Sequence, residues 1–301
     1  MIKKYSSLIF IVCALLCLWH LESCSLINPP ETIPCYGHID KIGLTTNPTL
    51  QGSNSANISC AWVYVDDQPI GTFALSNTFP ILASNGSHTI TIIPGISADG
   101  ANSTREQYPF FAAYNATVNL TQGSVTHFSY TTSYISGTAF AWLEDFDEGP
   151  SFSITTDKTR TISDTSMFRV GAPYSFQGYS GEVVLDSNAQ YNHNTYFGYS
   201  DTMSLPSDGP DFLELNYNTN ATFGVQLLYG DSYNTAVPAY HDFFVTIYPS
   251  SGWQKIYIDL SSGVENLNNG PFIIGFYLQR PVGLAQATLL LDNIKVLHLK
   301  I

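Results

Sequence analysis

The last stretch of the chain, Gln286–Ile301, constrains the fold most, because its apolar residues follow the two-residue period of a β-strand. The phase of this period slips twice. Leu289 and Leu291 point to one side of the strand, Ile294 and Val296 to the other, and Leu297 and Leu299 to the first side again. Such slips are typical of a long central strand covered on both faces, or of a strand bulged at Asp292-Asn293. Because a bulge re-aims side chains, the second alternative places an acidic residue where the strand changes phase.

The rest of the chain repeats short runs with strand character, separated by turns. The N-terminal half is expected to form strands near 36–44, 58–65, 70–74, 88–93, 117–120 and 125–131. Further strands are expected near 166–170, 181–187, 195–204, 211–218, 222–229, 241–248, 253–260 and 271–278. Aromatic residues make up 14% of the chain and charged residues only 12%, which favours a β-rich extracytoplasmic protein.

Small polar residues near 131–137 indicate a boundary between two units. We therefore predict an all-β protein with a small β-sandwich over 34–135. A larger jelly-roll β-sandwich over 138–301 follows, since eight or more strands suit a two-sheet jelly roll.

The first 23 residues have the pattern of a signal peptide. Lys3 and Lys4 precede an apolar segment over 8–19, which at 12 residues is too short to span a bilayer. The following Leu21-Glu22-Ser23-Cys24 resembles the lipobox of bacterial lipoproteins, although Glu22 replaces the usual small residue. The resemblance implies a lipid on Cys24 and a tether over 24–33. An ordinary secretory signal cut nearby is the alternative.

The charge of the mature chain limits its partners. Removing residues 1–23 takes away Lys3, Lys4 and Glu22, which leaves 9 basic and 23 acidic residues and a net charge of −14. Such a chain is not a nucleic-acid-binding protein, because binding to phosphates requires basic surfaces. It would also be repelled by anionic lipids, so we expect membrane attachment through the lipid anchor only.

Two cysteines, Cys35 and Cys60, remain in the folded part of the mature chain. An oxidising compartment would permit a disulfide between them, and two buried free thiols are the alternative. No histidine or basic residue nearby marks either cysteine as an activated thiolate.

A hairpin followed by a return strand is expected in the N-terminal unit. Trp62-Val63-Tyr64-Val65-Asp66-Asp67-Gln68-Pro69-Ile70-Gly71 has a polar turn, and Gly86-Ser87-His88-Thr89-Ile90-Thr91-Ile92 follows. This pattern resembles the small PEGA-type β-module over about 30 residues, although Asp67 stands where a turn glycine is usual. The resemblance implies an extracellular spacer without a catalytic residue, and we expect the sandwich over 34–135 to be PEGA-like or immunoglobulin-like.

The C-terminal unit resembles the galactose-binding-like jelly rolls of many carbohydrate-binding modules. The resemblance rests on an opening E-D-F-D-E-G at 144–149, L-E-L-N-Y at 213–217, W-Q-K-I-Y-I-D-L at 253–260 and L-D-N-I-K-V at 291–296. With the lipobox and the PEGA-like region, the whole chain resembles uncharacterised lipoproteins of the Bacteroidota, which implies the outer membrane. No acidic run follows Cys24, so the sequence does not decide between its periplasmic and surface faces.

A structural calcium ion is implied by the same resemblance, because jelly rolls of this type often join their first and last strands through one. The matching positions are Glu144 or Asp147 with Asp292. Carboxylate oxygens are suitable calcium ligands. A solvated acidic loop is the alternative, since 145–149 lacks the ligands and spacing of an EF-hand.

Sugar binding requires flat aromatic faces beside hydrogen-bonding groups. The two-residue period places Trp253 and Tyr257 on one face of their strand, and Glu214 and Asn216 on the outer face of another. If the two strands share a sheet, these four residues form one side of a sugar-binding cleft. Tyr196, in the tyrosine-rich run 191–199, is a second candidate. Packing in the core is the alternative for the aromatic residues.

The aromatic residues of the long loop 94–114, Tyr108, Phe110 and Phe111, are expected to pack against the neighbouring domain rather than to bind a ligand. We assign no catalytic residue, because the chain lacks G-x-S-x-G, H-E-x-x-H, a glycine-rich phosphate loop and a Cys/His metal cluster. The predicted function is non-catalytic glycan binding. A structural or assembly protein of the envelope that binds a protein partner is the alternative, and a polysaccharide hydrolase is a weaker one.

Overall fold

The structure is a computed structural model of the 301-residue chain, and it describes residues 33–100, 103–148, 165–187, 194–229, 240–266 and 271–300. The predicted signal peptide, Cys24 and nearly all of the predicted tether lie outside these residues. Among the described helices, none has the length and apolar character needed to cross a membrane.

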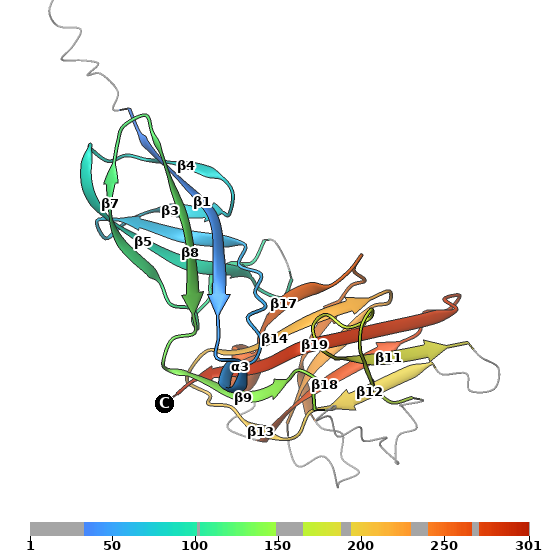
Figure 1. Cartoon of the computed structure of the whole chain (residues 1–301). Helices are drawn as coiled ribbons and strands as arrows, with labels where there is room; N and C mark the ends of the chain where they lie inside the picture. The colour runs from blue at the N-terminus through green and yellow to red at the C-terminus, as the bar shows by residue number, and fades with distance from the viewer. Residues whose placement is uncertain are drawn as a thin grey trace, which may run out of the picture.

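The strands up to Ser133 form two sheets that pack as a β-sandwich (Figure 1). One sheet has the order β4-β1-β8, and the other has the order β3-β2-β5-β6 with β7 paired to β5. The strands are β1 (Cys35–Thr45), β2 (Cys60–Val65), β3 (Gln68–Ala74), β4 (Thr78–Ile81), β5 (Gly86–Ser97), β6 (Arg105–Gln107), β7 (Tyr114–Leu120) and β8 (Val125–Ser133). A short helix, α3 (Pro48–Gln51), follows β1.

The predicted hairpin is confirmed in β2 and β3, which pair antiparallel across Asp66 and Asp67. Both aspartates have positive φ angles, 49° and 63°, as a tight two-residue hairpin turn requires. Asp67 therefore occupies the left-handed conformation that a turn glycine would adopt. The predicted return strand is also confirmed, because β5 pairs antiparallel with β2.

The strands from Thr138 onward form a second, larger sandwich of two antiparallel sheets. One sheet has the order β10-β11-β19-β14-β17 with β9 paired to β19, and the other has the order β12-β18-β15-β16 with β13 paired to β18. The strands are β9 (Thr138–Glu144), β10 (Phe168–Val170), β11 (Ser180–Asp186), β12 (Thr195–Tyr199), β13 (Met203–Ser204), β14 (Asp211–Thr219), β15 (Phe223–Tyr229), β16 (Tyr240–Ile247), β17 (Gln254–Asp259), β18 (Pro271–Gln279) and β19 (Gln286–Leu299). The helix α4 (Ser261–Asn266) follows β17. The all-β prediction is confirmed.

The last strand, β19, lies inside its sheet and pairs with β9, β11 and β14. Its register against β14 shifts so that Asn293 and Ile294 oppose one residue, Leu215, and Asn293 has a φ angle of 49°. The predicted bulge is therefore confirmed. It returns Ile294 to the core on the same side as Leu291, while Leu297 packs on the other face.

One end of the N-terminal sandwich packs against a sheet of the C-terminal sandwich through a shared apolar contact (Figure 1). Phe212, Tyr257 and Leu297 from the C-terminal sandwich belong to the same buried cluster as the core of the N-terminal sandwich. The outer face of the sheet that contains β14, β17 and β19 is therefore a domain interface.

The predicted disulfide is wrong, because Cys35 and Cys60 are both buried free thiols. They lie on β1 and β2, which belong to different sheets of the N-terminal sandwich. Each thiol has its own neighbour, since Cys35 donates to the Ala83 carbonyl and Cys60 lies beside the Ser59 hydroxyl. Burial raises the pKa of the Cys60 thiol.

Candidate functional site

The face predicted to bind sugar points away from the core of the C-terminal sandwich, and the part of it that carries Glu214, Asn216 and Tyr257 is closed to solvent. Glu214, Asn216 and Tyr257 are only 0%, 2% and 1% exposed. β14 and β17 do share a sheet, and Glu214 lies directly opposite Tyr257. The placement of these three residues in a sugar cleft is nevertheless wrong, because other parts of the chain cover the face.

The N-terminal sandwich covers the part of this face that carries Phe212 and Tyr257. Tyr108 makes this contact, which confirms the prediction that it packs against the neighbouring domain. Ring centroids of Tyr108 and Phe212 lie 5.2 Å apart, and those of Tyr108 and Tyr257 lie 5.0 Å apart. The backbone also crosses the interface, since the N–H of Asn57 donates to the Tyr257 hydroxyl and that of Asp99 donates to the Tyr257 carbonyl. Tyr257 is thus an interface residue.

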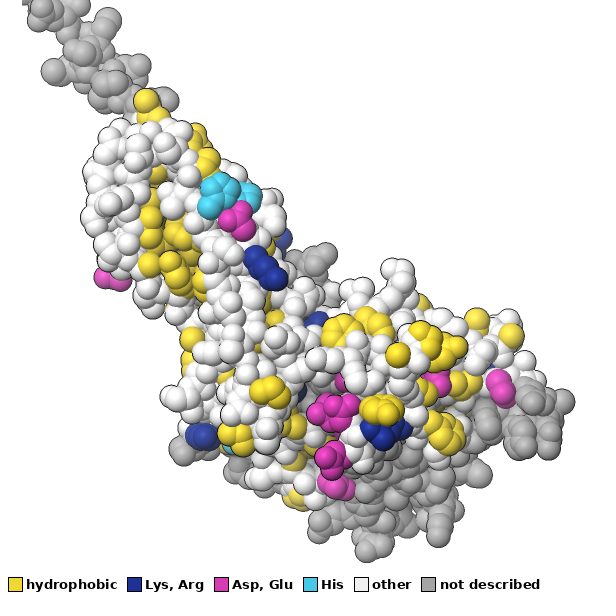
Figure 2. Space-filling model, viewed as in Figure 1, with side chains coloured by type: hydrophobic (Ala, Val, Ile, Leu, Met, Phe, Trp, Pro, Cys, Tyr) yellow, Lys and Arg dark blue, Asp and Glu magenta, His cyan; other side chains and the backbone are white. Residues whose placement is uncertain are grey.

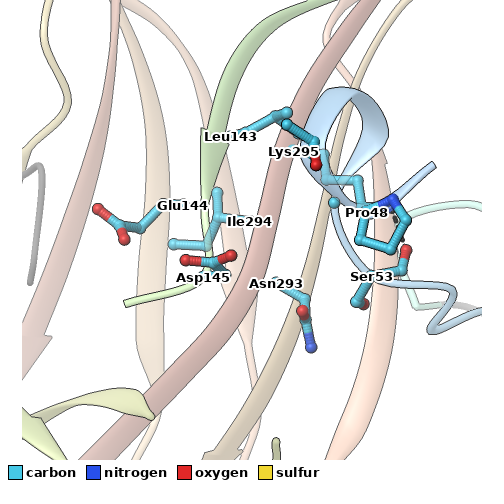
Figure 3. A pocket seen from close by; sticks show the side chains of 10 residues that line it. Pro48, Ser53, Leu143, Glu144, Asp145, Asn293, Ile294 and Lys295 are labelled. Atoms are coloured by element: carbon cyan, nitrogen blue, oxygen red, sulfur yellow. Dashed lines mark hydrogen bonds between the residues drawn. The ribbon is translucent and has the colours of Figure 1, made fainter. Parts of the chain in front are cut away.

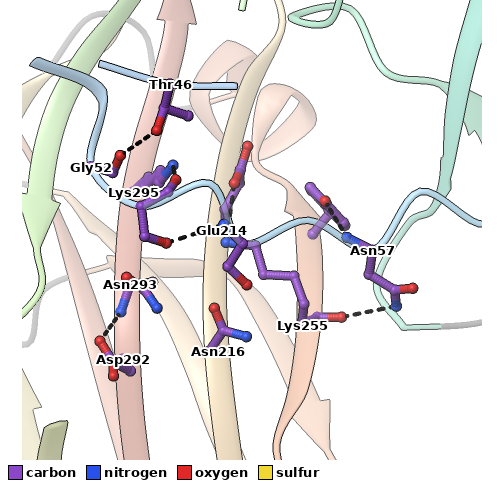
Figure 4. Close-up of polar contacts among 12 residues, drawn as sticks. Thr46, Gly52, Asn57, Glu214, Asn216, Lys255, Asp292, Asn293 and Lys295 are labelled. Atoms are coloured by element: carbon purple, nitrogen blue, oxygen red, sulfur yellow. Dashed lines mark hydrogen bonds and ion pairs between the residues drawn. The ribbon is translucent and has the colours of Figure 1, made fainter. Parts of the chain in front are cut away.

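Glu214 is the centre of a buried polar network at the same interface (Figure 4). Its carboxylate lies 3.1 Å from Lys255 Nζ and accepts hydrogen bonds from the hydroxyls of Tyr108 and Tyr134 at 2.7 and 2.9 Å. Lys295 Nζ donates to the Tyr134 hydroxyl and to a backbone carbonyl of the N-terminal sandwich. Burial raises the pKa of Glu214, but the two ammonium groups and the hydroxyl donors outweigh it and lower the pKa, so the carboxylate is ionised.

Trp253 lies directly before the first residue of β17, beside a loop with aromatic residues that are exposed to solvent. The loop 171–179, between β10 and β11, brings Phe176 to within 5.4 Å of Trp253, measured between ring centroids. Tyr174, Phe176 and Tyr179 are 61%, 41% and 42% exposed, and Trp253 is partly exposed. We name the group Tyr174, Phe176, Tyr179 and Trp253 the aromatic platform.

Two charged side chains, Arg169 and Asp147, contact the loop at Tyr179. The guanidinium of Arg169 lies 3.4 Å from the centre of the Tyr179 ring and donates to the Asp147 carbonyl. The carboxylate of Asp147 accepts the Tyr179 N–H at 3.2 Å. Gly178 has a φ angle of 56°, and a Cβ there would lie 2.4 Å from Asp147 Oδ1. This close approach therefore requires glycine.

Asp292 anchors the other side of the loop from the bulge in β19. Its Oδ2 accepts the Ser180 hydroxyl at 2.7 Å and the Gln177 N–H at 3.2 Å, while Oδ1 accepts the Asn293 N–H. Burial raises the pKa of Asp292 to about 6 against these donors. The bulge therefore directs a carboxylate at the backbone that carries the aromatic platform.

The predicted calcium ligands lie at one end of the C-terminal sandwich, where β9 pairs with β19 and Glu144 lies opposite Ile294. Glu144 accepts the Phe146 N–H, and the carboxylates of Asp147 and Asp292 accept hydrogen bonds from the loop. Among the described residues, these three side chains do not bring three ligand atoms within 4.8 Å of one another. The arrangement does not fit a calcium cage as it stands, and calcium binding stays a prediction.

Tyr196 is wrong as a ligand-binding residue, because it is fully buried in the core of the C-terminal sandwich. β12 turns its neighbours Phe197 and Tyr199 to the other face of the sheet, where their ring centroids lie 4.2 Å apart. The ring centroid of Tyr277 on β18 lies 6.0 Å from that of Phe197. The tyrosine-rich run therefore does contribute aromatic side chains to the face of the sheet that points away from the core, but they are Phe197 and Tyr199 rather than Tyr196.

A small pocket lies where α3 meets β9 and β19 (Figure 3). Both sandwiches line it, with Pro48, Thr49, Gly52 and Ser53 on one side and Leu143, Glu144, Asp145, Asn293, Ile294 and Lys295 on the other. The side-chain nitrogen of Asn293 is buried without a hydrogen-bond partner in the described part of the chain. The pocket is part of the interface and contains no residue of the aromatic platform.

Sequence reasoning missed Tyr174, Phe176, Tyr179 and their support, Arg169. The three aromatic residues lie between two correctly predicted strands, in a loop whose side chains follow no period, and Arg169 lies on the first of these strands, β10. A usable signal was present, since four aromatic or charged side chains surround Gly171 and Gly178 within 11 residues, 169–179. Loops rich in exposed aromatic residues on a rigid scaffold are common binding elements.

No protein-family model matches the chain, and no curated protein matches it. Solved structures that resemble it include the K1 cleaved adhesin domain of Lys-gingipain from Porphyromonas gingivalis W83, at 14% identity and a TM-score of 0.36, covering 53% of this chain and 96% of that one. TmCBM61 in complex with β-1,4-galactotriose has 15% identity and a TM-score of 0.33, with 50% and 92% covered. The CBM22-2 xylan-binding domain from Paenibacillus barcinonensis Xyn10C has 10% identity and a TM-score of 0.34, with 52% and 98% covered. At these TM-scores the likeness identifies no ligand, so the function rests on the side chains of the site.

Proposed function

We propose that this protein is a non-catalytic glycan-binding protein and that the aromatic platform is its binding surface. The observation that carries the proposal is that the loop 171–179 holds Tyr174, Phe176 and Tyr179 at least 41% exposed and brings Phe176 against the partly exposed Trp253. Sugar rings offer apolar C–H patches that stack on such rings.

Polar groups beside the rings would supply the hydrogen bonds that sugar hydroxyls need. Gln177 is exposed within the same loop, and Arg169 lies against the Tyr179 ring. Because Asp147, Ser180 and Asp292 hold the loop by hydrogen bonds, little conformational entropy would be lost on binding.

The proposed location is the outer membrane of a bacterium, with the chain attached through a lipid on Cys24. This part of the proposal rests on the lipobox-like sequence Leu21-Glu22-Ser23-Cys24 and on the net charge of −14 after processing. An acidic, charge-poor chain gains nothing from anionic lipids, so the anchor would provide the attachment.

A protein partner is the second candidate for the same surface. Tryptophan, tyrosine and arginine dominate the binding energy of many protein interfaces, and the aromatic platform with Arg169 has this composition. On this alternative the protein would be a structural or assembly component of the envelope.

A glycan array probed with the chain from residue 25 to 301, followed by calorimetry on the best glycan, tests the proposal. Trp253→Ala and Phe176→Ala are each expected to weaken binding about tenfold or more, since stacked aromatic residues act as binding hot spots. Leu82→Ala is the control, because Leu82 is 81% exposed but lies on the N-terminal sandwich. Unchanged glycan affinity in both platform variants, with unaltered melting temperatures, would overturn the placement. Absence of binding to any glycan would overturn the function and favour a protein partner.

A further inference from the structure

Two histidines and an aspartate meet on the surface of the N-terminal sandwich, far from the aromatic platform. β1 and β8 run parallel, and their register places His38 directly opposite His127. Asp40 lies two residues beyond His38 and therefore on the same side of β1. Figure 2 shows histidine side chains in cyan against an acidic side chain in magenta on this surface.

The three side chains bring their ligand atoms together. Asp40 Oδ1 lies 2.9 Å from His127 Nδ1 and 3.4 Å from His38 Nε2. The two imidazole rings are 5.1 Å apart between centroids and tilted by 45°. All three ligand atoms lie within 4.8 Å of one another, and no other such group of three occurs among the described residues.

A neighbouring strand orients His38 for coordination. Its Nδ1 lies 3.0 Å from the Thr78 hydroxyl on β4. When Nδ1–H donates to that hydroxyl, the lone pair of the neutral ring is on Nε2, the atom that faces Asp40. A hydrogen bond to the distal ring nitrogen commonly fixes metal-binding histidines in this way.

A bulge in β1 contributes to the arrangement. The register between β1 and β8 shifts between Ile39 and Lys41, and the buried pattern of β1 resumes at Ile42. Asp40 and Lys41 are therefore both exposed at the bulge. Asp40 remains within reach of both imidazoles.

We propose that His38, Asp40 and His127 form a binding site for a divalent transition metal ion, with Zn²⁺ as the probe. Two imidazole nitrogens and one carboxylate oxygen are a ligand set that zinc accepts, with water at the remaining position. The site would be selective against Ca²⁺, which prefers more oxygen ligands. Because the ligands come from β1 and β8, the bound ion would tie the first strand of the sandwich to the last.

Zinc titration of the chain 25–301 by calorimetry, purified without a histidine tag, tests this site. We expect Zn²⁺ to bind and to raise the melting temperature, whereas Ca²⁺ does not reproduce the binding at this site. His38→Gln, Asp40→Asn and His127→Gln should each weaken zinc binding about tenfold or more and reduce the thermal shift. Melting in EDTA checks that each variant is folded, and the His127 variant is expected to be the least perturbed because its side chain is 61% exposed, against 21% for His38 and 42% for Asp40.

His88 provides the matched control, since its Nδ1 lies 2.6 Å from Asp66 Oδ2 in a His–Asp pair outside the group of three. His88→Gln should leave zinc binding unchanged. Zinc binding of undiminished affinity and stoichiometry in the double variant His38→Gln/His127→Gln would overturn the proposal. An equal loss in His88→Gln would do so as well, because any surface His–Asp pair would then suffice. Neither result bears on the aromatic platform.

Discussion

Asn293 has a left-handed backbone conformation in the middle of β19, where a strand residue would ordinarily be extended. Asparagine tolerates this conformation better than most residues, whereas β-branched residues are strongly disfavoured there. The residue adds the bulge that turns Asp292 toward Ser180 and Gln177. One backbone angle thus links the last strand to the loop that carries the aromatic platform.

Asn293→Val is expected to lower the free energy of unfolding by roughly 1–3 kcal/mol, because valine resists a φ angle of 49°. Asn293→Gly should stay within about 1 kcal/mol of the wild type, because glycine accepts the angle and the unpartnered buried amide is removed. Denaturant unfolding measures both changes. Thr288→Val on the same strand is the control, and equal losses in the valine and glycine variants would contradict the role given to the angle.

At the scale of elements, β12 shows how one strand fixes which aromatic residues face outward. The Tyr196 hydroxyl is buried without a hydrogen-bond partner among the described residues, and it occupies the space beside Gly198. A Cβ on Gly198 would lie 2.0 Å from that oxygen. The pair therefore fills the core and leaves Phe197 and Tyr199 on the opposite face.

Gly198→Ala is expected to destabilise the protein by roughly 1–3 kcal/mol through overpacking. Tyr196→Phe removes the obstructing, unpaired hydroxyl and should be neutral or stabilising. The double variant should recover part of the loss, so the interaction energy in a double-mutant cycle measures the contact directly. Additive effects would show that the hydroxyl is not what Gly198 accommodates.

The strands themselves were predictable because the two-residue period of apolar side chains can be seen within each short segment of sequence. The slip at Asp292-Asn293 even indicated the bulge, since a phase change needs an extra residue. Solvent exposure was not predictable in the same way. Glu214 and Tyr257 do face away from their own core, but residues at least 80 positions away along the chain cover Glu214.

The candidate site was only partly predictable for a related reason. Trp253 was predicted because it flanks a periodic strand, whereas Phe176 and Tyr179 lie in a loop without a period, and the ligand-binding role of Trp253 stays a prediction. The cysteines show the same limit, since residue type permits a disulfide but only the sheet to which each strand belongs decides it. Tertiary contact, rather than local pattern, places these side chains.

At the scale of the whole molecule, the interface joins the two sandwiches through buried charge as well as apolar packing. Glu214 forms an ion pair with Lys255 at one point, and Lys295 also acts electrostatically on its carboxylate. A second group of carboxylates lies around Asp259. Asp259 repels Glu106 from the N-terminal sandwich and Asp211 from its own, and the Asp211 oxygens are buried without partners in the described chain.

This second group makes the stability of the molecule depend on pH. Burial, followed by repulsion from Asp259, raises the pKa of Asp211 from 3.8 to about 7 and that of Glu106 from 4.5 to about 7. Between the ordinary pKa of each group and about pH 7, the folded state therefore binds more protons than the unfolded state. Stability from both groups is fully present below pH 4 and is lost as the pH rises through about 7.

Asp211→Asn is accordingly expected to raise the free energy of unfolding at pH 8 by at least ~1 kcal/mol, since one pKa unit corresponds to about 1.4 kcal/mol. Glu106→Gln should act in the same direction but less, because Glu106 keeps contact with solvent. Both gains should shrink at pH 5, where the wild-type carboxyls hold their protons. Melting temperatures across pH 5–8 measure the effect, and Glu265→Gln, at an exposed position on α4, is the control. A gain that is the same at pH 5 and pH 8 would show that removing the carboxylate, rather than relieving its charge, stabilises the interface.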